Sequence, residues 1–562
     1  MRSLLSKARA RSPRGAARRG RRGATLALAS LLISGALGAL GCGRAGAPAG
    51  TAEQVFRFRL REDPPTLDPA LSNDNLSEAV IQPLFRGLVG LDPETLEVRP
   101  AVAASWTISP DHRTYTFHLR DDALFHNGRK VMARDVAYSF LRILRKETNS
   151  PRRSILEPLQ GAREFTEGKS SSVAGITVRD DRTIELRLAH PFAPFLATLT
   201  IPAAAIVPSE VYDDPAKAYL RAPVGCGPFR FSRWQQSNFI ELLAFDRYYG
   251  GRPPLDRVVV RIIENHLSAL QEYRAGGLDS LDQPPDEGDA ALIKELGPEI
   301  KRYPFMATGY LGFNHALPPF KGNAKLRQAF NYAVDKKYIW EVLEPGVAIP
   351  AHGLIPPGIP GYDPDLPGYP YDEAKAKHLL AEAGYPEGRG LPPITFWINT
   401  SEDNRRVAEQ IQADLRKISV NVTIREVDWS AYLAAMQGTK DQAGPAQMFR
   451  FGWGLEYPDA DSILRTALHS SNWGPGGNFF RYKNPEVDRL LDQALDVVEP
   501  AARAALYRRA ERIAVMDDAA LLFLNYYIEA TLFKPYVQGV VLTPLGEFRI
   551  PLERLRIAKG PA

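Results

Sequence analysis

The chain has 562 residues, which is too many for one ordinary hydrophobic core, so two or more lobes are expected. Hydrophobic residues make up 44% and charged residues 24%, proportions typical of a soluble globular protein. The net charge of +5 misleads, because residues 1–41 hold nine lysines and arginines and no acid. The remainder has 61 basic and 65 acidic side chains, so the charge does not indicate binding to nucleic acid.

Residues 1–41 have the three parts of an export signal peptide: a basic start, an apolar run at 24–41, and small residues before Cys42. The run is short and rich in glycine, alanine and serine, which favours a signal over a membrane-spanning helix. Ala39-Leu40-Gly41-Cys42 is similar to a bacterial lipobox, in which Cys42 carries the lipid and becomes the mature N-terminus. We therefore expect a lipoprotein of the cell envelope, with 42–53 as a flexible tether to the membrane.

The remaining cysteine and the histidines give no sign of redox or metal chemistry. If Cys42 is lipidated, Cys226 has no disulfide partner, and a small buried side chain is expected there. The histidines, His126 among them, lack metal-ligand spacing and are expected to be structural. No metal site and no cofactor are predicted.

After residue 53 the chain begins with strand patterns. Residues 55–60 and 115–119 alternate apolar and polar side chains, as half-buried strands do. From Ala133 the period becomes helical, and one apolar face is formed by Val136, Phe140, Ile143 and Leu144.

The second half alternates strands with helices, which favours a sheet covered by helices and a mixed α/β fold class. Strands are predicted at 394–398 and 420–427, and helices at 325–335, 372–384, 403–418, 429–436, 485–497 and 501–515. A long apolar run at 521–533 predicts one further strand.

Several short motifs occur in a fixed order. They are Ala-Ala-Ser-Trp at 103–106, Thr-Phe-His-Leu-Arg at 116–120, Phe-His-Asn-Gly at 125–128, Ala-Arg-Asp-Val at 133–136 and Pro-Val-Gly-Cys-Gly-Pro-Phe at 223–229. With them the chain resembles the dipeptide/oligopeptide-binding proteins of bacterial ABC importers, which are extracellular solute-binding protein family 5. Met132 stands where this family usually has a helix-capping threonine, and we expect Asp135 to compensate from the first helical turn.

The resemblance implies a two-lobed periplasmic-binding-protein fold of type II, with an extra subdomain in the first lobe and a two-strand hinge. The first lobe would comprise 54–305 and 525–562, with the subdomain at about 88–200, and the second lobe 306–524. The chain would cross between the lobes near 306–310 and 521–525, and such a hinge allows closure around a ligand.

The resemblance also implies a function. The chain would be a monomeric, lipid-anchored extracytoplasmic protein that captures short peptides between its lobes and delivers them to an ABC permease and its ATPase. Relatives of this fold also bind cell-wall peptides, metal chelates or sugars, so each of these remains an alternative ligand for this chain. A third alternative is an envelope interaction protein that keeps the fold without transport.

The candidate site centres on 448–464. Residues 448–451 predict a short strand, and Gly452-Trp453-Gly454 predicts a turn after it. By resemblance, Glu456 would meet the ligand's α-ammonium group, although the family has an aspartate there, and Arg450 would help to neutralise its carboxyl end. The remaining implied ligand residues are Phe449, Phe451 and Gly452 through their backbone, Trp453 and Trp429 at side-chain pockets, and Asn73, Asp74 and Asn75 on the first lobe.

An enzyme is the competing interpretation. Glu456 with Asp459 or Asp461 has the residue types of a glycosidase acid and base. However, Asp459 and Asp461 are also the residues expected to cap a helix that begins near Ala460. No nucleophile elbow, zinc-protease motif or phosphate-binding loop is present, so we expect a binding protein rather than an enzyme.

Overall fold

A computed structural model describes residues 53–214, 217–282, 290–346, 348–474, 477–546 and 549–558. The expected signal peptide, Cys42 and nearly all of the tether lie outside these described residues. Within the described part of the chain, no helix is both long and apolar enough to span a membrane.

The first lobe contains a four-stranded sheet in the order β1 (Val55–Leu60), β10 (Arg257–Ile262), β9 (Phe239–Ala244) and β8 (Phe229–Gln235). β1 and β10 are parallel, and the other neighbours are antiparallel. The core under this sheet joins Phe56 of β1, Val80 of α1 (Asn75–Leu84) and Leu555 near the C-terminus. The first and last described strands and turns of the chain therefore share one core.

A second sheet of the first lobe has the order β4 (Ala103–Ile108), β5 (Thr114–Leu119), β7 (Thr183–Arg187) and β6 (Ile176–Asp180). Helix α2 (Ala133–Leu144) packs against β6 and β7, and all four residues of its predicted apolar face are buried. At the start of α2, the Met132 N–H donates to Asp135 Oδ2 at 2.9 Å. Asp135 thus supplies one half of a capping box, a bond to the cap residue's N–H, and it also lies favourably in the helix dipole. The half that a threonine side chain would supply is missing at Met132.

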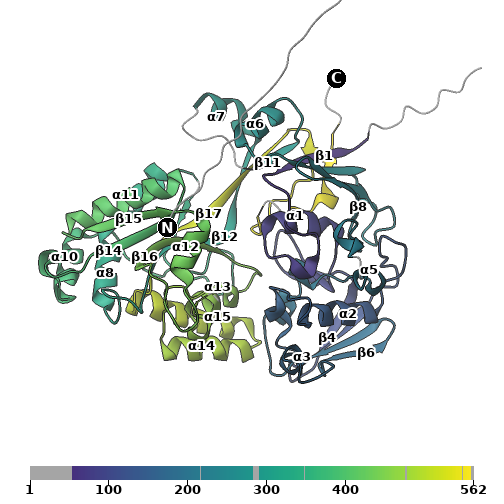
Figure 1. The fold of residues 1–562 in the computed structure, drawn as a ribbon, viewed down its shortest axis with the longest axis horizontal. Helices are drawn as coiled ribbons and strands as arrows, with labels where there is room; N and C mark the ends of the chain where they lie inside the picture. The colour runs from purple at the N-terminus through teal and green to yellow at the C-terminus, as the bar shows by residue number, and fades with distance from the viewer. Residues whose placement is uncertain are drawn as a thin grey trace, which may run out of the picture. The chain divides into compact units, whose positions relative to one another are not determined.

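The second lobe is built on a larger mixed sheet (Figure 1). Its strands follow the order β11 (Ser280–Asp282), β17 (Leu521–Phe533), β12 (Ile300–Phe313), β16 (Met448–Gly454), β14 (Ile394–Asn399) and β15 (Val422–Val427), and β13 (Ala348–Pro350) pairs with β17. The main helices here are α8 (Ala324–Ala333), α10 (Glu373–Glu382), α11 (Glu402–Lys417), α12 (Trp429–Gln437), α13 (Ala460–Leu468), α14 (Pro485–Asp496) and α15 (Pro500–Arg512). The predicted alternation of strands and helices in this half of the chain is confirmed.

Shorter elements complete the fold. They are β2 (Val89–Leu91), β3 (Val98–Pro100), α3 (Ala162–Thr166), α4 (Phe195–Thr198), α5 (Ser209–Tyr212), α6 (His266–Arg274), α7 (Ala290–Leu296), α9 (Lys336–Tyr338), β18 (Val537–Gln538) and β19 (Arg556–Ile557).

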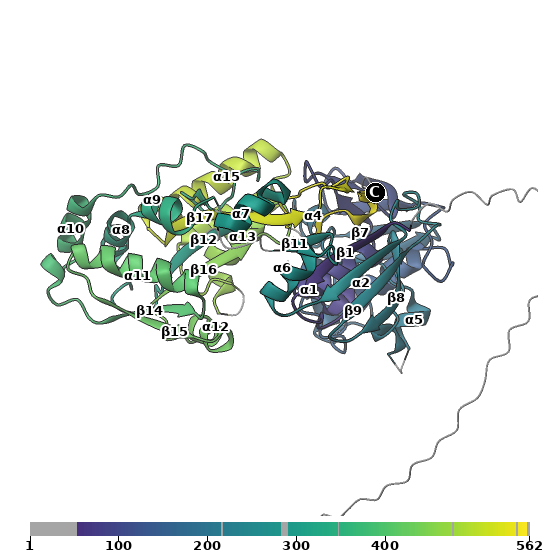
Figure 2. The same cartoon turned by 90° about the horizontal axis from the view of Figure 1, so that it is seen from above.

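Two long strands connect the lobes. β12 and β17 pair antiparallel from Ile300–Leu532 to Gly312–Leu521, with register shifts near Pro304 and Gly309, and Figure 2 shows them side by side. Leu521 at the start of β17 lies in a core of the second lobe, whereas Phe533 at its end belongs to the core of the first. The chain thus forms the expected mixed α/β fold of two lobes with a two-strand connection, while the residue limits given above for each lobe stay predictions.

Candidate functional site

Strand β16 carries the central part of the candidate site and has one largely open edge. It pairs with β12 along its whole length, from Phe313–Met448 to Ala307–Gly454. On its other side, β14 pairs only with Met448 and Phe449. The prediction of a turn at Gly452-Trp453-Gly454 is wrong, because the ladder with β12 continues through these residues and keeps them extended.

The register shows which backbone groups lie at the open edge. The Leu455 N–H donates to Met306 O at 2.8 Å, and the Asn314 N–H donates to Gln447 O at 2.8 Å, so odd-numbered residues of β16 direct their backbone groups toward β12. Even-numbered residues therefore direct theirs toward the open edge.

Gly452 and Gly454, the edge glycines, thus present their backbone N–H and C=O groups at the open edge, whereas the Arg450 carbonyl accepts a hydrogen bond from the Tyr432 hydroxyl. The expectation that Phe449 and Phe451 offer backbone groups to a ligand needs correction, because their groups face β12. Among the three residues expected to bind the ligand through their backbone, Gly452 alone directs its N–H and C=O groups toward the open edge.

The aromatic residues beside β16 form a continuous surface, here called the aromatic shelf, which consists of Trp429, Phe451, Trp453 and Phe479. The Trp429 and Phe451 rings are stacked with centroids 6.3 Å apart and an interplanar angle of 7°. Phe479 meets Phe451 edge to face at 5.3 Å. Trp429 is 52% exposed, so one large ring surface faces solvent. An indole placed in this way can stack on many kinds of side chain.

Arg450 is neither an exposed strand arginine nor a free cation. It is 9% exposed, its Nη2 forms an ion pair with Glu344, and its Nη1 donates to Asn404 Oδ1 at 2.5 Å. The side chain expected to neutralise a ligand carboxylate therefore already has an anionic partner from the same chain.

Glu456 also has a partner, but from the other lobe. Its side chain, 40% exposed, forms an ion pair with Arg152, which precedes the short 3-10 turn Arg153–Leu156 of the first lobe. The Glu456 N–H donates to Ser462 Oγ at 3.0 Å and fixes the backbone at this position. Arg465, an alternative partner for Glu456, instead binds Asp461 at 2.9 Å and Asp492 at 3.0 Å.

Asp459 caps α13 as predicted, whereas Asp461 lies in the first helical turn and does not cap it; its carboxylate pairs with Arg465. Asp459 is the N-cap of α13: its Oδ1 accepts from the Asp461 N–H at 3.0 Å, and its Oδ2 pairs with Arg503 at 2.7 Å. Burial raises the pKa of Asp459, and the charge of Arg503 opposes that rise. The Asp459 carboxylate is thus engaged at the helix start and the Asp461 carboxylate with Arg465, so neither is free to act with Glu456 as an acid–base pair.

The three residues expected on the first lobe lie at the start of α1. Asp74 is the N-cap, and its Oδ1 accepts from the Ser77 N–H at 2.8 Å. Asn73 and Asn75 flank it and are exposed. In the part of the chain that the structure describes, no hydrogen bond or ion pair joins these residues to β16, so their role as ligand residues stays a prediction.

Cys226 and His126 are structural, as predicted. The Cys226 thiol is buried against Arg86 O at 3.7 Å, and burial raises its pKa to about 12. His126 accepts from the Gly225 N–H through Nδ1 at 3.2 Å, so its Nε2–H donates to Gly227 O at 3.1 Å. Burial lowers the pKa of His126 to about 4. Among the described residues, no cluster of three His, Cys, Asp or Glu side chains is arranged to hold a metal ion.

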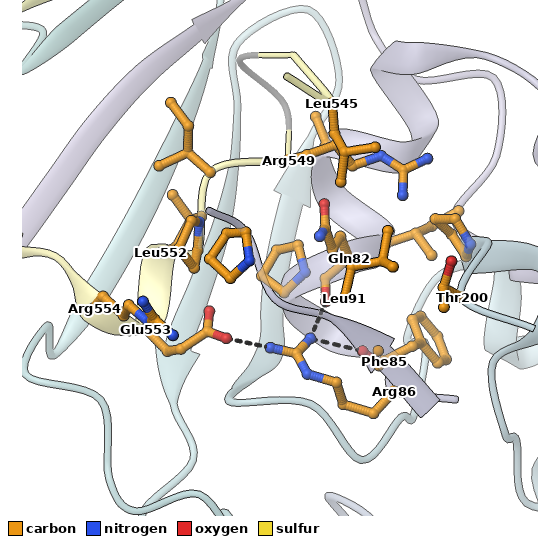
Figure 3. A pocket seen from close by; sticks show the side chains of 18 of the residues that line it. Gln82, Phe85, Arg86, Leu91, Thr200, Leu545, Arg549, Leu552, Glu553 and Arg554 are labelled. Atoms are coloured by element: carbon orange, nitrogen blue, oxygen red, sulfur yellow. Dashed lines mark hydrogen bonds and ion pairs between the residues drawn. The ribbon is translucent and has the colours of Figure 1, made fainter. Parts of the chain in front are cut away.

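A cavity of about 220 Å³ lies apart from these residues (Figure 3). It is lined by β1, α1, β11 and the segment 549–554, and none of the predicted ligand residues lines it. Several of its charged side chains are paired: Arg86 with Glu553 at 2.6 Å, Arg59 with Asp282 at 3.1 Å, and Arg549 with Glu78. The exposed Arg554 also lines it. The cavity is mostly apolar, and its paired charges do not point to a ligand class.

Comparison with known proteins decides the family. Residues 97–475 match the family described as bacterial extracellular solute-binding proteins, family 5. The chain belongs to this family.

Members of family 5 with assigned ligands are similar along nearly their whole length. The heme-binding protein A of Haemophilus influenzae is 33% identical over 518 residues, which cover 88% of this chain and 91% of that protein. The dipeptide-binding protein of Escherichia coli is 31% identical over 486 residues, covering 83% and 88%. The solved structure of DppA from Helicobacter pylori in complex with the peptide STSA has a TM-score of 0.74 and 30% identity, covering 90% of this chain and 98% of that one.

Several residues that contact the candidate site around β16 were not predicted, because no local sequence pattern indicates their contacts. Arg152 pairs with Glu456 although the two are 304 positions apart in the sequence, and Glu344 pairs with Arg450 although they are 106 positions apart. Tyr432 lies one helical turn beyond Trp429, and its hydroxyl bonds Arg450. Only the three-residue spacing from Trp429 to Tyr432 could have indicated that both side chains share one face of α12.

Proposed function

We propose that this family 5 protein captures short peptides between its two lobes and delivers them to an ABC permease and its ATPase. The observation that carries the proposal is the open edge of β16, where the edge glycines direct backbone N–H and C=O groups outward. An extended peptide can add to such an edge as a further strand.

The chemistry of this edge favours recognition without strong sequence preference. Backbone hydrogen bonds do not read side chains, and the edge glycines place no side chain of their own in the way. The aromatic shelf beside them offers the exposed Trp429 ring to ligand side chains of different kinds. A peptide importer that takes mixtures needs this combination.

Capture is proposed to work by closure about β12 and β17. In the described part of the chain these long strands carry the sheet from one lobe to the other, and we propose that rotation about them would bring the first-lobe Asn73 and Asn75 toward the edge glycines. A ligand that contacts both lobes stabilises the closed form, which the permease then distinguishes from the open one. The dipeptide-binding relative and the peptide complex of DppA support this proposal.

The proposed location is the cell envelope, with the protein held on a membrane as a monomer by lipid on Cys42 and the segment 42–53 as tether. No catalysis is proposed. Asp459 and Asp461 are occupied as a helix cap and as an ion-pair partner, so a hydrolase based on Glu456 lacks its second carboxylate.

The test is the fate of a peptide incubated with the protein. A mixture of dipeptides to pentapeptides should raise the melting temperature in proportion to the logarithm of its concentration, and mass spectrometry should recover every peptide unchanged. Mass spectrometry of ligands that copurify with the protein should identify peptides. Turnover that disappears in Glu456→Gln would instead establish the hydrolase.

A metal chelate is the second candidate ligand. The heme-binding relative and the exposed Trp429 ring, which suits a flat aromatic ligand, favour it. Heme titration followed by absorbance separates the two: saturable heme binding that Trp429→Ala abolishes, with no response to peptides, would replace the peptide proposal.

A further inference from the structure

We propose that Glu344 is a built-in counter-ion that withholds Arg450 from the ligand, so that this site does not select peptides by a terminal carboxylate. This inference rests on the proposed function and adds a specificity determinant to it. Peptides that end in a neutral group, or that extend beyond Arg450, would bind as well as those with a free carboxylate near it.

The geometry leaves Arg450 little capacity for a second anion. The Arg450 and Glu344 side chains are only 8% and 12% exposed, and they are joined through Nη2 and Oε1. The other guanidinium branch, Nη1, is bound to Asn404 Oδ1 at 2.5 Å. A ligand carboxylate would have to displace one of these partners to form a bidentate pair.

The three side chains come from separate elements and are held in place. Glu344 follows the short π-helical turn Ile339–Leu343, and Asn404 lies in the first turn of α11. Asn404 is oriented by a hydrogen bond from its Nδ2 to Asn399 Oδ1 at 2.8 Å. The cluster is therefore an organised site and not a chance contact between two long surface side chains.

The ion pair is close to the open edge of β16. A Cβ atom added to Gly452 would lie 2.6 Å from the Tyr527 hydroxyl oxygen, so this hydroxyl covers the sheet face at Gly452. The pKa of Tyr527 is raised by burial, and the charges of Arg450 and Glu344 act on it in opposite directions. Arg450 lies two positions from Gly452 on β16, so its side chain leaves the sheet on the face that Tyr527 covers at Gly452, and it brings Glu344 to that face.

The energetics favour a neutral site. Removing one partner of a buried ion pair leaves an uncompensated charge, which is strongly unfavourable, so Glu344 is held at Arg450. A ligand carboxylate that approaches would meet the field of a neutralised arginine and the repulsion of Glu344. Attraction for an anionic end is therefore small in the native protein and should appear once Glu344 is made neutral.

The experiment uses one peptide in two forms, with a free carboxyl terminus and with a carboxamide terminus. Calorimetry should give dissociation constants within about twofold of each other for the native protein. In Glu344→Gln, the free acid should bind at least about tenfold more tightly than the amide, since about 1.4 kcal/mol corresponds to tenfold. The double variant Glu344→Gln/Arg450→Gln should return the ratio to about one.

Glu341→Gln is the matched control, because Glu341 is an exposed carboxylate nearby that pairs with Lys337. It should leave the acid-to-amide ratio unchanged. An acid preference above tenfold in the native protein, or an unchanged ratio in a folded Glu344→Gln, overturns the inference while peptide binding itself stands. If Glu344→Gln does not fold, the ratio of the acid and amide dissociation constants in the native protein still tests the inference. If neither form of a peptide series binds to the native protein, the proposed function fails as well.

Discussion

Arg152 and Glu456 form an ion pair across 304 positions of the chain, and this contact joins the first lobe to the acid expected to bind a ligand ammonium group. If Glu456 binds the ligand's amino terminus, as we propose, the Arg152 guanidinium occupies that place in this structure. A ligand with a cationic end must compete with Arg152 for Glu456. Because Glu456 is partly exposed, this competition is modest and depends on salt.

Replacing Arg152 by methionine should free Glu456 for the ligand. We expect peptides with a free α-amino group to bind about two- to tenfold more tightly, because a partly exposed ion pair no longer has to be broken. The N-acetylated forms should be unaffected. Calorimetry on both forms measures the effect, and Arg153→Met, a change in the adjacent arginine, is the control. Equal gains for acetylated peptides would show that Arg152 acts sterically.

The edge glycines should differ in their tolerance of a methyl group. In Gly452→Ala the new Cβ would lie 2.6 Å from the Tyr527 hydroxyl, whereas in Gly454→Ala its nearest neighbour is 3.6 Å away. We expect Gly452→Ala to reduce the free energy of unfolding by about 1–3 kcal/mol through overpacking, and Gly454→Ala to be nearly neutral. Chemical denaturation measures both. Adding Tyr527→Phe to Gly452→Ala should restore part of the loss, and no restoration would argue against this contact.

Trp429 should matter for binding much more than for folding. Because its ring is about half exposed, Trp429→Ala should change the unfolding free energy by less than about 1 kcal/mol. Peptide affinity should fall about tenfold, since stacked contact with the ligand is lost. Leu267→Ala, another exposed apolar residue, serves as the control and should leave affinity unchanged. A large loss of stability without loss of affinity would assign Trp429 to the core instead.

Stability should decrease on mild acidification because of His126. Burial lowers its pKa in the folded protein to about 4, below the ordinary histidine value of 6.5, so the unfolded chain takes up a proton first as the pH falls. Its contribution is fully present above about pH 6.5 and is lost as the pH falls toward 4, by about 2 kcal/mol at pH 5. Denaturation curves at pH 7 and pH 5 measure the change.

His126→Gln should reduce that pH dependence, since glutamine does not titrate in this range. His378→Gln should not, because His378 is exposed and paired with Glu382. An identical pH dependence in the native protein and His126→Gln would assign acid sensitivity to other groups, of which the buried His315 is the first to examine.

Local features of the fold were predictable from the sequence because they depend on near neighbours. The apolar face of α2, with Val136 and Phe140, follows from helical spacing, and Asp459 follows from the preference of helix starts for short acids. The first part of β16 was predicted for the same reason. Its extension through Gly454 was not, because it depends on the ladder with β12, which lies more than a hundred positions earlier.

The candidate site was less predictable because its charged side chains are neutralised by partners that lie far away in the sequence. The sequence places Arg450 and Glu456 six positions apart and so favours a ligand with two charged ends. Their actual partners, Glu344 and Arg152, come from distant segments that no spacing rule connects to β16. Which backbone groups of β16 face outward likewise depends on its register with β12, a property that two strands set together.

The burial of Cys226 has a practical consequence for observing motion. Its thiol is inaccessible, and burial keeps it protonated, so maleimide reagents should leave it unmodified in the folded protein. A soluble form that begins after Cys42 would then accept cysteines introduced at two chosen surface positions as its reactive thiols. With a donor dye on Ser154→Cys and an acceptor dye on Asp492→Cys, single molecules would report each opening and closing event as a change in energy transfer.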